Sequence, residues 1–316
     1  MKLCVQTGDV VDRLGFDKGY GAIKDAGFSA VDWNLDHALK ESDLEKGTYK
    51  GTCIFEKSLD EVIAHYTEEL SYIRKYDLVI NQAHAPFPPY IYGDDFSIEY
   101  NISVYKRMIE YMDYAGCRNV VIHGVKFLPN RDKSITEAMH KELNFKLYES
   151  LIPTLLACKN PVKVCLENLV VWYKNENGTI GYEHGVCSVP EEAASWVDEL
   201  NAKAGKNVFG FCFDVGHANL IGKKPSEFMN VLGSRITAFH VHDNDGIRDR
   251  HLAPFTGTID WIDFCNALKN IGFDGTMDFE TYASHNKGLD FSEEMGLLWL
   301  NTIGKIGQLF IDRVKE

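Results

Sequence analysis

An aspartate stands directly behind the apolar stretch 209–213, in the sequence CFDVGHANL, and a histidine follows it three positions later. Phe209, Phe211 and Phe213 have the pattern of a buried strand, so Asp214 ends that strand with a charge. A buried carboxylate without a partner costs free energy. Asp214 therefore requires a cation, a substrate hydroxyl or a hydrogen-bond network close by.

The ends of other apolar stretches carry the same kinds of side chain. Taken alone, a histidine in an apolar strand is more often a hydrogen-bonded core residue than a ligand. A strand-end acid is more often a cap or an ion-pair partner. Taken together, these residues are candidates for one site: His84, His123, Glu167, Asp214, His217, His240, His242, Asp249, His251 and Glu280.

Four of these residues lie at the ends of successive apolar stretches, namely Glu167, Asp214, His240 and Glu280. Three carboxylates that close together would repel one another and could not all ionise without a cation. A mixed shell of carboxylates and an imidazole suits a divalent ion such as Mn, Co, Fe or Zn better than Ca. The lack of a cysteine argues against a purely structural zinc site. The pattern therefore predicts a metal site.

Eight short apolar stretches would position these side chains, with amphipathic segments of helical length between most of them. Alternating strands and helices imply parallel pairing through right-handed crossovers. Eight such units predict an α/β fold of the (β/α)8 TIM-barrel type, in which the carboxyl ends of the strands face one mouth. An open doubly wound sheet is the alternative, but no G-x-G-x-x-G follows the first stretch. The stretches are 3–7, 30–34, 78–84, 119–124, 162–168, 208–214, 236–243 and 276–281.

Local signals place helix starts and one long loop. Ser58 with Glu61, and Ser188 with Glu191, have the capping-box pattern. No linker or low-complexity stretch interrupts the chain, so we expect residues 1–316 to form a single barrel domain. The longest irregular segment is a loop at 169–187 after the fifth strand. A loop of that length inside a compact domain is usually functional, for example as a lid.

The composition limits the classes of partner. Of the 316 residues, 45% are hydrophobic and 25% are charged, and the formal net charge is −13. That charge disfavours broad nucleic-acid binding, which relies on clustered Lys and Arg. No apolar run approaches the roughly 18 residues of a membrane span, and the N-terminus does not resemble a signal peptide.

The cysteines indicate a reducing compartment. The eight cysteines contain no C-x-x-C pair, and several lie inside apolar stretches, so they are interpreted as buried thiols. We therefore expect a cytoplasmic protein that acts on a small molecule. A homo-oligomer is compatible with this interpretation.

Four stretches, CLENL, FDVGHANL, FHVHDNDGIRDRHLAPFTGTIDW and GTMDFET, resemble the xylose-isomerase-like TIM barrels. These are sugar phosphate isomerases and epimerases, and they share their fold with endonuclease IV. The resemblance extends through nearly the whole chain and is most specific over 162–281. In the family's ketose 3-epimerases a Glu, an Asp, a His and a Glu bind one divalent metal, and the two glutamates serve as acid and base. The resemblance implies these roles for Glu167, Asp214, His240 and Glu280.

The endonuclease branch of this fold holds three zinc ions in a larger cluster. Its additional ligand positions match His84, His123, His217, Asp249 and His251, so the ligand set does not separate the two branches. His217, together with His242, also matches positions that contact substrate oxygens in the epimerases. The acidic net charge and the segment HLAPFTGTIDW favour the sugar branch, although residues 255–256 depart from the P-G-x-G form common in both.

The sequence therefore predicts an enzyme, a divalent-metal-dependent isomerase or epimerase of a ketose or related polyol, with Mn, Co, Zn or Mg as its cofactor. Glu167 or Glu280 would remove a proton from the carbon next to the carbonyl. Trp33 is a further candidate for packing against the sugar, and Arg250 for binding a carboxylate or phosphate. The alternatives are an inosose-type dehydratase, an endonuclease IV-like phosphodiesterase acting at abasic sites, and a non-catalytic sugar-binding protein.

Overall fold

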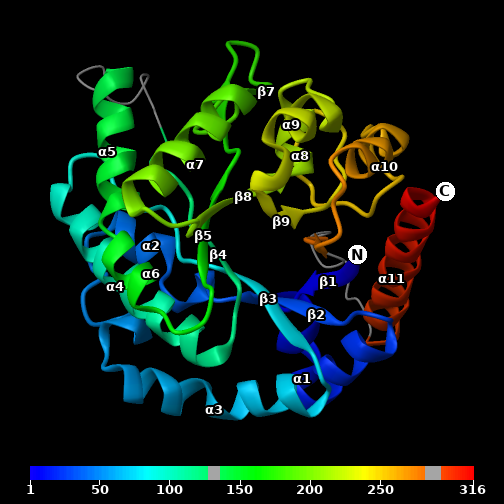
Figure 1. Ribbon diagram of the computed structural model, residues 1–316, viewed down its shortest axis with the longest axis horizontal. Coiled ribbons are helices and arrows are strands. Elements are labelled where there is room, and N and C mark those ends of the chain that lie inside the picture. The colour runs from blue at the N-terminus through cyan, green and yellow to red at the C-terminus, as the bar shows by residue number, and fades with distance from the viewer. Residues whose placement is uncertain (127–135, 282–292) are drawn as a thin grey trace.

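Eight parallel strands pair in the order β10-β1-β2-β3-β4-β5-β8-β9 in the computed structural model, which describes residues 1–126, 136–281 and 293–316 (Figure 1). The two end strands meet as well, because Val241 and Phe279 form a parallel bridge and Val241 N donates to Asp278 O at 2.8 Å. The predicted TIM barrel is confirmed. The strands are β1 Lys2–Gln6, β2 Ala30–Asn34, β3 Val79–His84, β4 Asn119–Val121, β5 Lys163–Glu167, β8 Phe209–Asp214, β9 Ile236–His240 and β10 Thr276–Phe279.

Helices surround the strands on the outside (Figure 1). The α-helices are α1 Gly8–Asp25, α2 Glu41–Glu45, α3 Leu59–Lys75, α4 Asp95–Ala115, α5 Glu137–Glu149, α6 Ile152–Ala157, α7 Pro190–Ala204, α8 Val215–Leu220, α9 Pro225–Leu232, α10 Trp261–Asn270 and α11 Glu293–Lys315. Short 3-10 turns occur at Asp36–Ala38, Ile54–Glu56 and Gly233–Arg235. Within the described ranges, no helix combines the length and the apolar character needed to span a membrane.

The barrel interior carries a small apolar layer beneath the strand ends. Four strands contribute one small, fully buried residue each to this layer, namely Val121, Cys165, Cys212 and Ala238. Side chains two residues apart on a strand point to the same face. The residues two positions further along these four strands therefore also face inward, at the carboxyl end of the barrel: His123, Glu167, Asp214 and His240.

One of the two predicted capping boxes is present. Ser58 accepts a hydrogen bond from Glu61 N, and Glu61 accepts one from Ser58 N at 3.0 Å. The second prediction is wrong, because α7 has Val189 as its N-cap and no side-chain cap. The following proline, at the first helical position, fixes the start one residue later than Ser188. Ser188 instead donates to Gly185 O at 2.8 Å.

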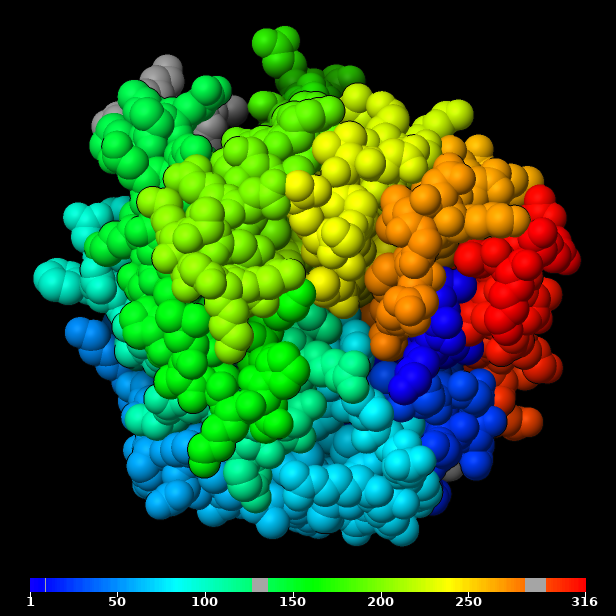
Figure 2. Space-filling view, in the orientation of Figure 1, coloured from blue at the N-terminus to red at the C-terminus, as the bar shows by residue number. Residues whose placement is uncertain are grey.

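The segment 169–187 forms an antiparallel hairpin where the sequence suggested irregular backbone. Its strands are β6 Val170–Lys174 and β7 Ile180–His184, joined by a tight turn. The dipeptide at 177–178 is Asn-Gly, a common hairpin-turn signal, so the sequence did contain this information. The hairpin tip stands out from the rest of the surface in Figure 2.

The closing helix α11 approaches the end of α1 so tightly that only glycine fits at position 304. A Cβ at Gly304 would lie 2.1 Å from Ala26 O, whereas a Cβ at Gly296 in the same helix would meet no described atom within 4 Å. Gly304→Ala should therefore lower the free energy of unfolding by about 1–3 kcal/mol. Gly296→Ala should raise it by up to about 1 kcal/mol, because alanine is the better helix former. Urea unfolding measures both, and equal changes in the two variants would contradict this packing.

Candidate functional site

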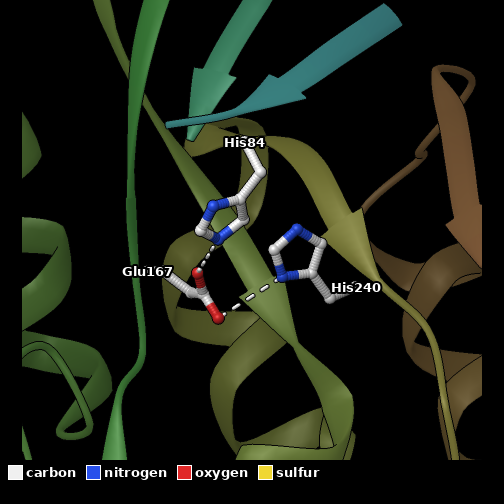
Figure 3. Close-up of side chains that lie close together, drawn as sticks. All are labelled: His84, Glu167 and His240. Atoms are coloured by element: carbon white, nitrogen blue, oxygen red, sulfur yellow. Dashed lines mark hydrogen bonds and ion pairs between the residues drawn. The ribbon is translucent and has the colours of Figure 1, made fainter. Parts of the chain in front are cut away.

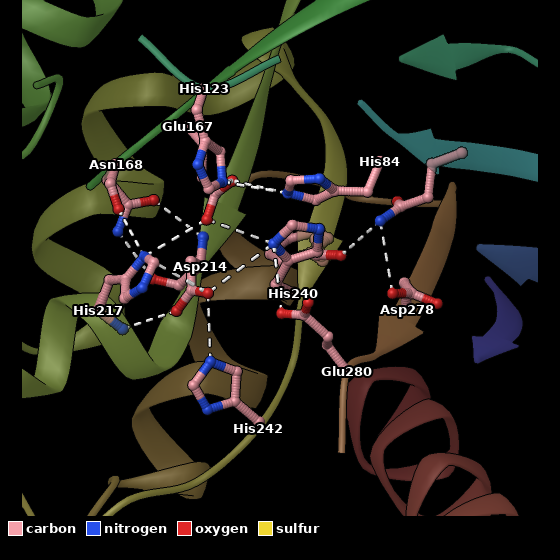
Figure 4. A network of polar contacts seen from close by, with 12 residues as sticks. His84, His123, Glu167, Asn168, Asp214, His217, His240, His242, Asp278 and Glu280 are labelled. Atoms are coloured by element: carbon pink, nitrogen blue, oxygen red, sulfur yellow. Dashed lines mark hydrogen bonds and ion pairs between the residues drawn. The ribbon is translucent and has the colours of Figure 1, made fainter. Parts of the chain in front are cut away.

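Ligand-type side chains from six strand ends meet inside the mouth of the barrel (Figure 4). Their centre is His240, whose side chain is almost completely buried. His240 Nδ1 lies 3.3 Å from Glu167 Oε1, 3.5 Å from Glu280 Oε2 and 3.8 Å from Asp214 Oδ2. Three carboxylates thus surround one ring nitrogen.

The four residues of the predicted metal set adjoin one another without forming one tight group. Ligand atoms of Asp214, His240 and Glu280 all lie within 4.8 Å of one another. Glu167 belongs to two neighbouring groups of the same kind, one with His240 and one with Asp214.

The first neighbouring group contains His84, Glu167 and His240, which converge from β3, β5 and β9 (Figure 3). Glu167 Oε2 lies 3.9 Å from His84 Nε2 and 3.1 Å from His123 Nε2. The two imidazoles also approach each other, with 3.1 Å between their Nε2 atoms. This side of the cluster is therefore rich in nitrogen donors.

Asp214, the residue that raised the first question, has two kinds of partner. One carboxylate oxygen caps helix α8 by accepting from His217 N at 2.6 Å. The other lies 3.2 Å from His242 Nε2. His217 Nε2 in turn lies 3.3 Å from Asp249 Oδ2. The strand-end charge is thus compensated by a helix N-terminus and by imidazoles.

The loop after β9 brings the remaining residues to the cluster. The rings of His242 and His251 stack with 4.0 Å between their centroids. His242, His251 and Glu280 form another group of ligand atoms within 4.8 Å. Asp249 N donates to Tyr182 Oη at 3.3 Å, so the hairpin contacts this loop.

Three histidines are oriented by backbone carbonyls. His84 Nδ1 lies 2.9 Å from Ala85 O, His217 Nδ1 lies 2.9 Å from Asn168 O, and His251 Nδ1 lies 3.0 Å from Glu280 O. A carbonyl oxygen only accepts, so each Nδ1 carries the proton. The Nε2 of His84 then faces Glu167, and the Nε2 atoms of His217 and His251 face Asp249. His240 instead turns Nδ1 to the three carboxylates and has no such carbonyl among the described residues.

Electrostatics inside the cluster favour an ionised Glu167 and a charged His240, but a neutral His123. Burial alone would raise the pKa of Glu167, but the imidazoles of His240 and His123 hold it well below its usual range. Burial works against the His240 imidazolium, but neighbouring groups, chiefly Cys212 and Glu280, raise its pKa well above the usual value. Burial lowers the pKa of His123 to about 4. The protein thus supplies positive charge around Glu167, but from imidazoles that can also serve as ligands.

Asp243 was not predicted, and it holds the loop that carries Asp249 and His251. It is fully buried and accepts from Gly257 N at 3.0 Å, Ile259 N at 3.2 Å and Trp261 Nε1 at 2.9 Å. The sequence signal for Asp243 was its position in HVHDND, directly after the predicted site residues His240 and His242. Three other polar residues in the barrel interior, Asp32, Gln82 and Asp278, were missed as well.

Two predicted substrate contacts lie elsewhere. Trp33 neighbours the inward-facing Asp32, and so points to the opposite face of β2. It packs against Tyr66, with ring centroids 5.3 Å apart, and donates to Glu69 Oε1 at 3.0 Å, so it belongs to the helix layer. Arg250 is partly exposed and lies 3.6 Å from Asp245 Oδ2 on its own loop. Trp33 thus lies outside the cluster, and Arg250 lies in an ion pair on its own loop.

Comparison with known proteins agrees with this architecture. The model of the family described as "Xylose isomerase-like TIM barrel" matches residues 21–302. The uncharacterized protein y4fM of Sinorhizobium fredii is 24% identical over 268 residues, covering 82% of this chain and 78% of that protein. A ketose 3-epimerase of Arthrobacter globiformis is 29% identical over 120 residues, 38% of each chain.

Two solved structures show the same fold. A D-tagatose 3-epimerase-like protein has a TM-score of 0.69 at 21% identity, covering 100% of this chain and 98% of that one. The IolI protein, crystallised with a zinc atom, has a TM-score of 0.65 at 17% identity, covering 97% of each chain.

The cluster makes a prediction about pH in the metal-free protein. Burial opposes protonation of His251, but Asp249 and Glu280 raise its pKa to about 9, whereas the pKa of His123 is lowered to about 4. The stabilisation from charged His251 is full below its unfolded pKa of about 6.5 and is lost as the pH rises through about 9. Histidine Cε1–H resonances followed by NMR should show these two separated midpoints. Midpoints near the ordinary value for both rings would contradict the described charge distribution.

Proposed function

The chain belongs to the xylose isomerase-like TIM barrel family, and we propose that it is a metal-dependent sugar isomerase or epimerase acting on a ketose or related polyol. The observation that carries this proposal is the meeting of Glu167, Asp214 and Glu280 around His240 Nδ1. Such an arrangement combines a cation site with two glutamates able to move protons.

The residues present fit a divalent cation. Buried carboxylates in contact repel one another unless a positive charge lies between them. Glu167 Oε2 is buried without a hydrogen-bond partner, although it faces two imidazoles. The oxygen and nitrogen donors of Glu167, Asp214, His240 and Glu280 suit Mn, Co, Zn or Mg, and zinc in the related IolI structure supports this choice. Such an ion, when bound, acts as a Lewis acid that stabilises negative charge on a carbonyl oxygen.

In this proposal the two glutamates exchange protons with one substrate carbon. Imidazoles keep Glu167 ionised, so it can accept a proton from the carbon next to the carbonyl. Glu280 is ionised as well; it takes a proton from water and returns it to the opposite face of that carbon, which inverts the carbon, and Glu167 then releases its proton to water. If the proton returns to the neighbouring carbon instead, an aldose and a ketose interconvert. A positioned general base contributes typically about 10²–10⁴-fold to the rate.

The surrounding histidines orient the hydroxyl groups. Burial opposes protonation of His217, but Asp214 and Asp249 raise its pKa well above the usual value, so its Nε2–H can donate to a substrate oxygen. His242 Nε2 lies beside Asp214 and on the same side of the cluster. The relative named a ketose 3-epimerase supports a ketose as the substrate class.

Proton abstraction predicts solvent exchange. Metal-loaded protein, incubated in deuterated water with a panel of ketoses and inosose, should introduce deuterium at the carbon next to the carbonyl, as seen by NMR. Glu167→Gln and Glu280→Gln should each lower this exchange by about 10²–10⁴-fold because each removes a proton carrier. Glu68→Gln, an exposed substitution on α3, is the control and should exchange normally.

The same preparation distinguishes the alternatives. Loss of a hydroxyl after label enters would identify a dehydratase. Nicking of a duplex with an abasic-site analogue would identify a phosphodiesterase. No label from any neutral or phosphorylated sugar would refute the isomerase proposal.

Removal of divalent ions should abolish exchange and lower the melting temperature. A ligand that binds only the folded state, present at 100 times its dissociation constant, stabilises it by about 2.7 kcal/mol. Melting curves with EDTA, and then with excess Mn²⁺ or Zn²⁺, measure this effect. Identical curves in all conditions would argue against a cation at this cluster.

A further inference from the structure

A layer of polar side chains lies in the barrel interior next to His240. Asp32 on β2, Gln82 on β3 and Asp278 on β10 are all at most 1% exposed. Burying such groups without full hydrogen bonding costs about 1–3 kcal/mol for each unsatisfied polar atom. A barrel interior needs no carboxylates for packing, so this layer calls for a functional explanation.

Gln82 ties the two carboxylates together. Its amide nitrogen donates to Asp32 Oδ2 at 3.0 Å and to Phe239 O at 3.2 Å, and lies 3.4 Å from Asp278 Oδ2. Asp32 is therefore held in place from the side of β3. The other side-chain oxygen of each of the three residues is buried and has no hydrogen-bond partner among the described residues.

Among the described residues, His240 has no backbone carbonyl bonded to its ring, unlike three other histidines of the cluster. In His84, His217 and His251 a backbone carbonyl fixes the proton on Nδ1. His240 presents Nδ1 to the carboxylates, and its buried Nε2 has no nitrogen or oxygen partner among the described residues. The carboxylate facing that nitrogen is Asp32, whose Oδ2 lies 3.8 Å away.

We propose that Asp32, held by Gln82, is a positioning residue that keeps the proton of His240 on Nε2 and so directs the Nδ1 lone pair at the cation. The inference rests on the proposed function, since it assumes a cation at Nδ1. Histidine ligands of metals almost always donate their other N–H to a carboxylate or carbonyl, which fixes the tautomer and the ring orientation. Asp32 would thus fix the tautomer of His240, as backbone carbonyls fix the tautomers of the other three rings.

Two other groups near the ring provide matched controls. Asp278 is equally buried and shares Gln82, but among the described residues it makes no ion pair with His240. Cys212 also contacts the His240 ring, and its thiol is the other polar group that could fix the proton. Substituting each in turn separates a specific effect of Asp32 from the general effect of removing a buried side chain near His240.

The test measures the affinity of the full-length protein for Mn²⁺ and Zn²⁺ by calorimetry after chelation. Asp32→Ala should weaken binding by about 10–100-fold, the usual effect of losing such a partner. Asp32→Asn, which keeps an acceptor, should recover part of the loss. Asp278→Ala and Cys212→Ala should bind within about threefold of the wild-type protein, well inside the 10-fold lower limit of that usual effect.

The melting temperature and the imidazole ¹⁵N shifts provide two further measurements. The melting temperature of the chelated Asp32→Asn protein should be no lower than that of the wild-type protein. Asparagine keeps an oxygen that can accept from Gln82, and it removes a buried carboxylate. If Asp32→Ala does not fold, the imidazole ¹⁵N shifts of His240 decide. They should show a protonated Nε2 in the wild-type protein with Zn²⁺, and a mixture of tautomers in Asp32→Asn.

Failure of this inference differs from failure of the proposed function. Wild-type affinity in Asp32→Ala, or an equal loss in Asp278→Ala, would overturn the positioning role while leaving the metal site intact. A wild-type protein that binds neither ion would instead overturn the metal-dependent function itself.

Discussion

The mouth of this barrel is organised around a concentration of negative charge out of contact with water. Glu167, Asp214 and Glu280 reach the same nitrogen of one buried imidazole. At such short range in a poorly hydrated interior, repulsion between carboxylates is strong. The groups nearby lower this repulsion, because imidazoles face the acids and Asp214 caps a helix N-terminus. In the proposed function a divalent cation would neutralise the remaining charge, so the charge that makes the site costly to fold would also bind the metal.

Hydrogen bonds on the side away from the cluster hold most of its side chains in place. Backbone carbonyls hold three of the imidazoles, and a carboxylate from the interior layer faces the fourth. Asp243 fastens the loop that carries Asp249 and His251 by accepting bonds from both backbone and indole N–H groups. Because these anchors are themselves buried, the ligands need little rearrangement to meet an ion. A preorganised site of this kind avoids the entropy cost of ordering its side chains at the moment of binding.

The sequence predicted the barrel and the main cluster because both depend on short-range patterns. Apolar stretches alternating with helices fix a parallel barrel, and the last residue of each stretch must lie at the mouth, which located Glu167, Asp214 and His240. Residues inside a strand were harder to interpret. Asp32 and Trp33 are neighbours, and the sequence alone does not say which of the two faces the barrel interior. The polar residue faces inward here and Trp33 packs against the helices, so the interior layer was missed.

In the proposed function, the first proton-removal step and the later steps that decide the product depend on different groups of residues. Epimerisation, isomerisation and dehydration next to a carbonyl all begin by removing the same proton, and a carboxylate beside a cation serves each of them. The later steps differ in where the proton or hydroxyl goes, and so depend on how the substrate lies across the mouth. The groups that can control that pose belong to the rim: His217 and His242, the loop pinned by Asp243, and the hairpin that reaches the loop through Tyr182. In the proposed function, the buried acids would therefore set the class of reaction, and the rim would set the substrate and the product.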